Sequence, residues 1–148
     1  MTDRSARSVD VGEESLADVL ARTTFVVVGA LTKAAAEEGL SLTQLRLLAI
    51  LRDRRASMSA VAAHLGLDRS TLSGLVERAQ SRGLLAREPN AHDGRGVDVF
   101  LTAQGHALAL RLQERITDDL TPFLDRLSTP DQHRLRRLLA QVLDGPSQ

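Results

Sequence analysis

The chain of 148 residues is long enough for one domain with a buried core, but too short for a core and a separate catalytic module. Its composition, 43% hydrophobic and 26% charged, is typical of a globular protein, and the absence of cysteine excludes disulfides, thiolate catalysis and cysteine-ligated zinc. The net charge is zero, yet residues 52–95 carry eight basic and five acidic groups, while the flanking segments are slightly acidic.

Polar residues 1–14 lack the apolar segment of a secretory signal and predict a short flexible tail, which is compatible with a cytoplasmic protein. A first helix is expected from a cap at Ser15 to Gly39, because apolar residues recur there at helical spacing. This helix is apolar on nearly every side, which is typical of a helix buried by more than its own domain. No apolar stretch approaches the roughly 18 residues needed to cross a bilayer, so no membrane span is expected. A second helix is predicted from a cap at Thr43 to about Asp53.

The next segment divides into two helices joined by a tight turn. Ser57 caps the first and Gly66 ends it, and Asp68 caps the second, which ends at Gly83. Such a pair is typical of a helix-turn-helix motif. Apolar residues between the two helices leave a polar outward face on the second, suited to contacts with bases and phosphates. This face comprises Arg69, Ser70, Thr71, Ser73, Gly74, Glu77 and Arg78.

Segments 84–88 and 97–101 are predicted to be strands, because the second alternates in polarity and the stretch between them is rich in turn residues. The tip of this hairpin presents Arg95 on glycine-flanked backbone, suited to insertion into a narrow, electronegative minor groove. Asp93 is expected to hold Arg95 or another arginine in position, and a protonated His92 would add a phosphate contact. The alternative interpretation is an exposed turn pair of little energetic value.

Two further helices are predicted after the hairpin. Thr102 caps a long helix, which Pro122 is expected to kink or break. The last helix follows Thr129 and Pro130 and carries an apolar stripe opposite an arginine face. This stripe and the apolar first helix both indicate an interface between subunits.

The run from Ser57 to Gly105 resembles the winged-helix core of the MarR family of bacterial regulators. The shared motifs are LGLDRSTLSGLVERAQSRGLL over the recognition helix, Asp93-Gly94-Arg95 in the wing and LTAQG at the start of the next helix. The resemblance implies a mainly α fold, a winged helix-turn-helix with a two-stranded wing and additional N- and C-terminal dimerisation helices. Residues 15–148 then form a single domain, with a DNA-binding lobe at about 41–101 and dimerisation helices at about 15–38 and 102–145.

The resemblance further implies a cytoplasmic homodimer that binds double-stranded DNA at a pseudo-palindromic operator, with half-sites roughly 10 bp apart. It implies a repressor that is released by a small aromatic or anionic effector, bound in a crevice between the dimer helices and the DNA-binding lobe. Thr23, Thr24 and Arg46 are the candidate effector contacts. The expected DNA contacts are Ser57, Ser59, Arg69, Ser70, Thr71, Ser73, Gly74, Arg78, Arg87, His92, Asp93 and Arg95.

The sequence also bears on function classes other than a DNA-binding regulator. Many relatives carry a larger, often basic residue at Gly74 and a charged one at Gly94, and together with the zero net charge this leaves open a protein-interaction module without significant DNA binding. No nucleophile elbow, phosphate-binding glycine loop or paired catalytic carboxylates occur in the sequence, so neither catalytic residues nor a cofactor are predicted. The histidines lack metal-ligand spacing, so no metal site is predicted. They are His64, His92, His106 and His133.

Overall fold

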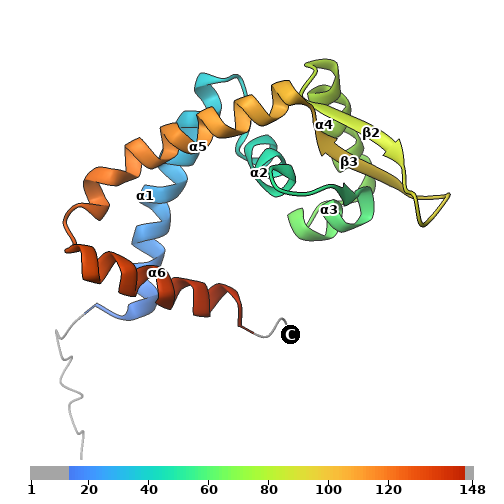
Figure 1. Ribbon diagram of the computed structural model, residues 1–148. Coiled ribbons are helices and arrows are strands. Elements are labelled where there is room, and N and C mark those ends of the chain that lie inside the picture. The colour runs from blue at the N-terminus through green and yellow to red at the C-terminus, as the bar shows by residue number, and fades with distance from the viewer. Residues whose placement is uncertain (1–13, 146–148) are drawn as a thin grey trace, which may run out of the picture.

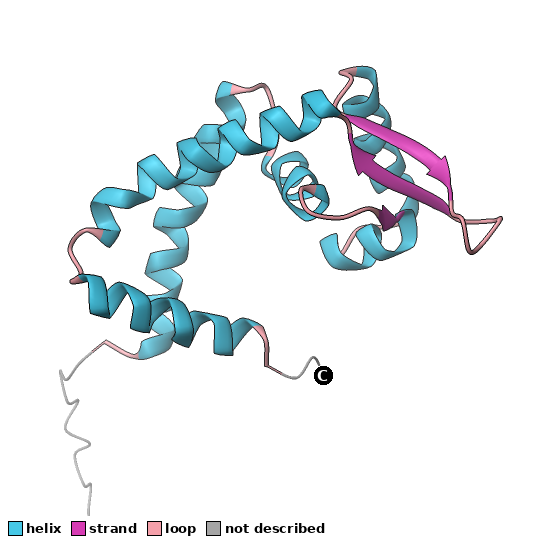
Figure 2. Ribbon diagram, in the orientation of Figure 1, coloured by secondary structure: helices cyan, strands magenta, loops and turns pink. Residues whose placement is uncertain are grey.

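A computed structural model gives the fold of residues 14–145 (Figures 1 and 2). The predicted tail lies outside these residues except for Glu14, and so do residues 146–148. The described part of the chain is mainly helical, as predicted. Its elements are α1 (Leu16–Glu37), α2 (Leu42–Leu51), β1 (Ala56–Ser57), α3 (Met58–Leu65), α4 (Arg69–Ser81), β2 (Leu85–Pro89), β3 (Val97–Leu101), α5 (Ala103–Leu124) and α6 (Thr129–Leu143).

The molecule has two ends of different character (Figure 1). At one end, α2, α3, α4 and the small sheet form a lobe, from which the β2–β3 hairpin projects. Helix α5 leads away from this lobe and packs against α1. Helix α6 follows at the far end of α5, away from the hairpin.

Most helix boundaries follow from local sequence chemistry. Four predicted N-caps are confirmed, because each side chain accepts a hydrogen bond from the backbone N–H three residues later. They are Ser15, Ser57, Asp68 and Thr102. The helix ends predicted at three glycines are correct to within two residues, since α1, α3 and α4 end shortly before Gly39, Gly66 and Gly83.

Two of the sequence predictions about helix boundaries were wrong. Helix α2 is capped by Ser41 rather than Thr43, because Ser41 and Gln44 form a reciprocal capping box: the Ser41 Oγ accepts from the Gln44 N–H at 3.1 Å, and the Gln44 Oε1 accepts from the Ser41 N–H at 2.8 Å. The break that the sequence allows at Pro122 does not occur either, because α5 continues through the proline and ends at Leu124.

The sheet has three strands rather than the two that the sequence predicts. Strand β1 pairs antiparallel with β3, with Ala56 opposite Val99 and Ser57 opposite Asp98, and the strand order is β1-β3-β2. A strand of two residues has too few positions to show alternation, so the pattern could not reveal it. The pairing attaches the start of α3 to the base of the hairpin.

The core lies inside the lobe and fixes the start of α5 on it. The largest fully buried side chains are Leu47, Leu51, Leu72, Leu85, Val61, Val76 and Val99. At the start of α5, the hydroxyl of its cap Thr102 donates to the Gly83 carbonyl in the turn after α4, at 2.6 Å. A Cβ added at Gly105 would lie 2.0 Å from the Leu84 carbonyl oxygen, so only glycine lets α5 pass this close to the turn before β2.

The other end of the molecule exposes apolar side chains. No residue of α6 is buried, and only Ala34 and Ala35 are buried in α1. The sequence argument that no apolar stretch approaches the length of a membrane span was wrong for α1. This helix is long and apolar enough to cross a membrane by length and composition alone. Only 11% of its apolar 18-residue window is buried, which is too little for a core helix of one subunit.

Candidate nucleic-acid interface

The outward face of α4 is presented by residues that anchor the helix from behind. Leu72, Leu75, Val76 and Ala79 are buried against the lobe. The predicted contact residues Arg69, Ser70, Thr71 and Arg78 are exposed, while Ser73 and Gly74 are half-buried. The structure therefore keeps these six residues on the solvent side of α4, as a recognition helix requires.

Asp68 organises the start of this face. Its Oδ1 accepts hydrogen bonds from the Thr71 N–H and the Ser70 hydroxyl, both at 2.8 Å, and its Oδ2 accepts from the Thr71 hydroxyl at 2.9 Å. These three bonds, led by the one from the Thr71 N–H, lower the pKa of Asp68 to about 2. The carboxylate is therefore ionised at neutral pH. The sequence predicted Asp68 as a cap but missed its bonds to the two hydroxyls.

Arg78 fills part of the surface that Gly74 leaves free. A Cβ added at Gly74 would lie 3.4 Å from Nη1 of Arg78, one helical turn later. The guanidinium thus lies over the glycine, and a cation occupies the surface beside position 74.

The tip of the β2–β3 hairpin is held by bonds to its own backbone. The Asn90 side-chain oxygen accepts from the N–H groups of His92 and Asp93, at 2.8 and 2.9 Å. Asp93 accepts from the Arg95 N–H at 3.0 Å. The carboxylate therefore fixes the backbone at Arg95 and not its guanidinium, which corrects part of the sequence interpretation. Asn90 was missed, although an Asn before a turn is a recognised signal for such bonds.

The remaining predicted contacts surround these two features. The Ser57 hydroxyl is occupied as the cap of α3, where it accepts from the Ala60 N–H at 3.1 Å, and Ser59 is exposed on the same helix. On β2, the Arg87 Nε donates to the Gln80 side chain of α4 at 2.9 Å, which joins the hairpin to the recognition helix.

An arginine that the sequence analysis did not single out connects α4 to α1. The Arg82 guanidinium donates to the backbone carbonyls of Glu38 at 2.9 Å and Gly39 at 3.4 Å, just beyond the end of α1. A cation is favoured at this end of a helix by the helix dipole. Arg82 thus attaches the end of α4 to the end of α1.

The lobe described above matches a known family. A family model described as MarR family matches residues 38–96, which span α2, the two helices of the motif and most of the hairpin. The regulator PecS of Dickeya dadantii is 31% identical over 138 residues, which cover 90% of this chain and 83% of PecS. The chain belongs to the MarR family.

Further comparisons extend over most of the chain of this MarR-family protein. The transcriptional repressor Rv2887 of Mycobacterium tuberculosis is 28% identical over 105 residues, which cover 70% of this chain and 76% of Rv2887. The solved structure of Bordetella bronchiseptica BpsR is similar with a TM-score of 0.71 and 25% identity, over 90% of this chain and 96% of BpsR. The protein is accordingly a DNA-binding transcriptional regulator and not an enzyme, and the apolar α1 is not a membrane span.

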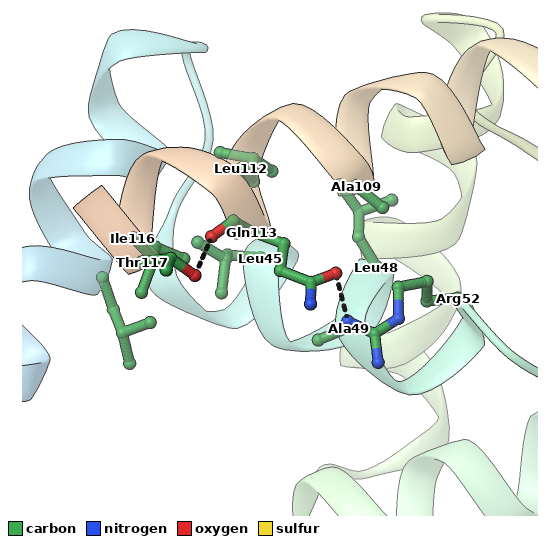
Figure 3. Close-up of a pocket in the computed structure, with 10 residues that line it drawn as sticks. Leu45, Leu48, Ala49, Arg52, Ala109, Leu112, Gln113, Ile116 and Thr117 are labelled. Carbon is green, nitrogen blue, oxygen red and sulfur yellow. Dashed lines mark hydrogen bonds between the residues drawn. The ribbon is translucent and has the colours of Figure 1, made fainter. Parts of the chain in front are cut away.

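A pocket of about 190 Å³ lies between α1, α2 and α5 of this MarR-family regulator (Figure 3). Its wall is mostly apolar and comes from α1, α2 and α5. The lining residues are Leu31, Leu45, Leu48, Ala49, Arg52, Ala109, Leu112, Gln113, Ile116 and Thr117. The three predicted effector contacts are not among them. Thr23 and Thr24 donate to the carbonyls one turn earlier in α1, and Arg46 is exposed on α2.

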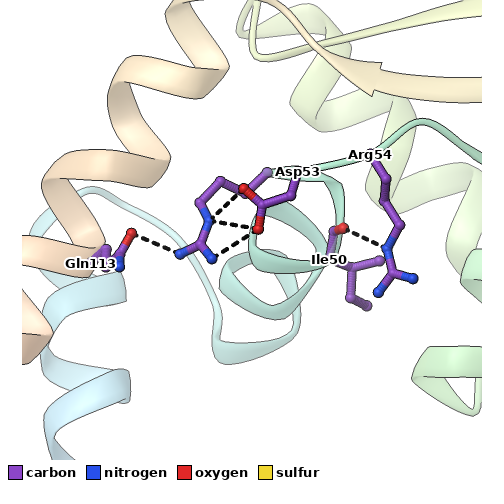
Figure 4. A network of polar contacts seen from close by, with 5 residues as sticks. Ile50, Asp53, Arg54 and Gln113 are labelled. Atoms are coloured by element: carbon purple, nitrogen blue, oxygen red, sulfur yellow. Dashed lines mark hydrogen bonds and ion pairs between the residues drawn. The ribbon is translucent and has the colours of Figure 1, made fainter.

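Arg52 is the cationic group of this pocket. It donates to the Gln113 side chain at 2.7 Å and to both oxygens of Asp53 (Figure 4). The hydrogen bonds with Asp53 raise the pKa of Arg52 and lower that of Asp53, so both groups remain charged. The neighbouring Arg54 instead donates to the Ile50 carbonyl at 3.3 Å. The pocket thus combines an apolar wall with one guanidinium.

Proposed function

We propose that the protein is a cytoplasmic repressor that binds a pseudo-palindromic operator as a homodimer and is released by a small aromatic or anionic effector. The observation that carries this proposal is the lobe itself, in which an exposed polar helix and an arginine-tipped hairpin are fixed on one core. The name of the relative Rv2887, a transcriptional repressor, supports repression over activation.

The proposed DNA interface follows from the placement of the side chains. Helix α4 enters the major groove, with Ser70, Thr71 and Ser73 toward base edges and Arg69 and Arg78 toward phosphates. The hairpin tip, with His92, Asp93 and Arg95, lies in the adjacent minor groove, where a narrow groove favours arginine. Ser57, Ser59, Gly74 and Arg87 complete the interface at its edges. The DNA-binding lobe is then residues 41–101.

The proposed dimer interface lies at the opposite end, on residues 15–38 and 102–145. Its support is the exposure of large apolar side chains from α1, from the end of α5 and from α6. They include Leu16, Phe25, Phe123, Leu124, Leu138, Val142 and Leu143. Large apolar side chains exposed in this number are typical of a contact with another chain. In a dimer with a twofold axis, this apolar surface of one subunit would pack against the same surface of a second copy of the chain. The two lobes would then lie on successive half-sites.

The proposed effector site is the pocket beside Arg52. Its volume of about 190 Å³ exceeds that of a cavity of roughly 150 Å³ that holds benzene, so a single substituted ring fits. The Arg52 guanidinium binds Asp53 and Gln113, and its remaining N–H groups would pair with a carboxylate on that ring. The DNA binding of BpsR is regulated by 6-hydroxynicotinic acid, which supports an effector of this class. We expect Ala49→Phe, at the pocket rim, to abolish release of DNA by aromatic carboxylic acids.

The decisive experiment is a gel shift of DNA from upstream of the protein's own gene, at several salt concentrations. We expect binding at submicromolar protein that weakens steeply with salt, because phosphate contacts release counterions. Arg95→Ala should weaken binding to all fragments and reduce the salt slope by about one per subunit. Arg137→Ala, on the arginine face of α6, is the matched control and should bind like the wild type. No shift at micromolar protein, or no dependence on salt, would instead favour the protein-interaction module.

A further inference from the structure

The three hydrogen bonds to Asp68 determine where two hydroxyl protons point. An ionised carboxylate has no proton to give, so the hydroxyls of Ser70 and Thr71 must both be donors to it. Each hydroxyl has only one proton. Both oxygens therefore present only lone pairs to a molecule that approaches from the solvent side, and they act as acceptors.

The major groove distinguishes bases by such donor and acceptor patterns. Cytosine N4 and adenine N6 are amino groups that donate, whereas guanine O6 and N7, thymine O4 and adenine N7 accept. A hydroxyl that is free to rotate accepts from the first set and donates to the second, so it discriminates weakly. A hydroxyl whose proton is already engaged pairs only with the amino groups.

We propose that Asp68 is a specificity-determining residue, which holds the Ser70 and Thr71 hydroxyls as acceptors so that the start of α4 selects cytosine or adenine edges. This inference rests on the proposed function, in which these two residues face base edges. It assigns a role in DNA recognition to a residue that does not itself need to touch a base.

The same arrangement separates base contacts from phosphate contacts on α4. Phosphate oxygens are acceptors, so hydroxyls without a free proton cannot bind them, and the Asp68 carboxylate repels them. Arg69, which lies between these residues in sequence and is exposed, is the group at this end of the helix that can bind phosphate. Asp68 thus directs Ser70 and Thr71 toward bases.

Asp68→Asn tests the inference with little cost to folding, because Asn caps helices about as well as Asp. The amide oxygen must take the Oδ1 position, since the Thr71 N–H donates there, and this oxygen keeps the bond from Ser70. The amide nitrogen then replaces Oδ2 and donates to the Thr71 hydroxyl, which frees the Thr71 proton. The substitution therefore lets the Thr71 hydroxyl donate to a base as well as accept from it, and leaves Ser70 as it was.

The measurement is selection of bound fragments from DNA with randomised half-sites, using the full chain at one salt concentration. Thr71→Val and Ser70→Ala first identify the base pair that each hydroxyl reads, as the position at which preference is lost. We expect Asp68→Asn to reduce the preference for an amino edge about fivefold at the Thr71 position and to leave the Ser70 position unchanged. In a Thr71→Val background, Asp68→Asn should change no preference.

The outcomes separate this inference from the proposed function. If Asp68→Asn changes affinity equally for all sequences while the wild type remains selective, Asp68 is only a cap and the inference is wrong. A wild type that prefers guanine or thymine at the Thr71 position would overturn it as well. A Thr71→Val variant that keeps the base preference of the wild type at every position would also overturn the inference. A wild type that selects no sequence would contradict the proposed function, and this inference with it.

Discussion

Gly74 lies inside α4, where a glycine lowers the stability of the helix. A Cβ at this position would meet only Arg78 Nη1, at 3.4 Å, which is an ordinary contact with the end of a flexible side chain. Alanine is favoured over glycine inside a helix by about 1 kcal/mol. We therefore expect Gly74→Ala to raise the free energy of unfolding by about 1 kcal/mol, measured by urea denaturation.

The same substitution at Gly105 is the matched comparison and should have the opposite sign. Its Cβ would lie 2.0 Å from the Leu84 carbonyl oxygen, so α5 would have to move away from the lobe. We expect Gly105→Ala to lower the free energy of unfolding by about 3 kcal/mol. A destabilising Gly74→Ala would contradict this prediction. It would show that the Arg78 side chain cannot move away from the added Cβ.

Single residues could be predicted from the sequence where their partners are near in the chain. The caps Ser15, Ser57 and Asp68 each bind a backbone group three residues away, so a short sequence motif contains both partners. Arg82 binds carbonyls 43 and 44 residues away, and no local pattern indicates that pair. The bonds from Ser70 and Thr71 to Asp68 are local, but they involve side chains that each have several alternative partners.

At the scale of elements, the sequence predicts those with enough positions to show a period. The six helices and the strands β2 and β3 were predicted by periodicity and by the turn residues between them. Strand β1, with two residues, depends on its pairing with β3, more than 40 residues later. None of the three predicted effector contacts lines the pocket beside Arg52, because its wall combines residues of α1, α2 and α5 that only packing brings together.

The connection between α4 and α1 depends on Arg82, which is a testable feature at this scale. Its guanidinium satisfies two carbonyls at the end of α1, and a hydrogen bond from a charged donor contributes about 1.5 to 3 kcal/mol. Both groups are near the surface, so we expect the lower end: Arg82→Met should lower the free energy of unfolding by about 1.5 kcal/mol. It should also speed amide exchange at the end of α1, measured by hydrogen exchange.

Arg78→Met is the control for this prediction, because Arg78 is an exposed arginine on the same helix. It should change the free energy of unfolding by less than about 0.5 kcal/mol and leave exchange in α1 unaffected. Equal effects of the two substitutions would show that arginine contributes to α4 in general and that the contacts of Arg82 with α1 are unimportant.

For the whole molecule, the proposed DNA-binding surface and the proposed dimer interface lie at opposite ends. The hairpin and α4 are at one end, and α6 lies at the other, with α5 between them (Figure 1). The sequence predicted this division from the apolar first helix and the stripe of the last helix. The sequence could not show how far the stripe lies from the core. The structure adds that no residue of α6 is buried in one subunit.

Val142→Asp tests the proposed dimer at a position that contributes little to the stability of the single subunit. Val142 is 70% exposed and α6 has no buried residue, so the substitution leaves the core of the lobe intact. In a dimer that buries α6, the new carboxylate would be desolvated without a partner, which costs several times RT. We expect sedimentation at micromolar concentration to change from dimer to monomer, and affinity for a two-half-site operator to fall at least about tenfold, because one lobe then binds alone. Arg137→Gln changes the net charge of α6 by the same amount on the arginine face and should remain dimeric. A Val142→Asp protein that still sediments as a dimer would show that α6 lies outside the interface.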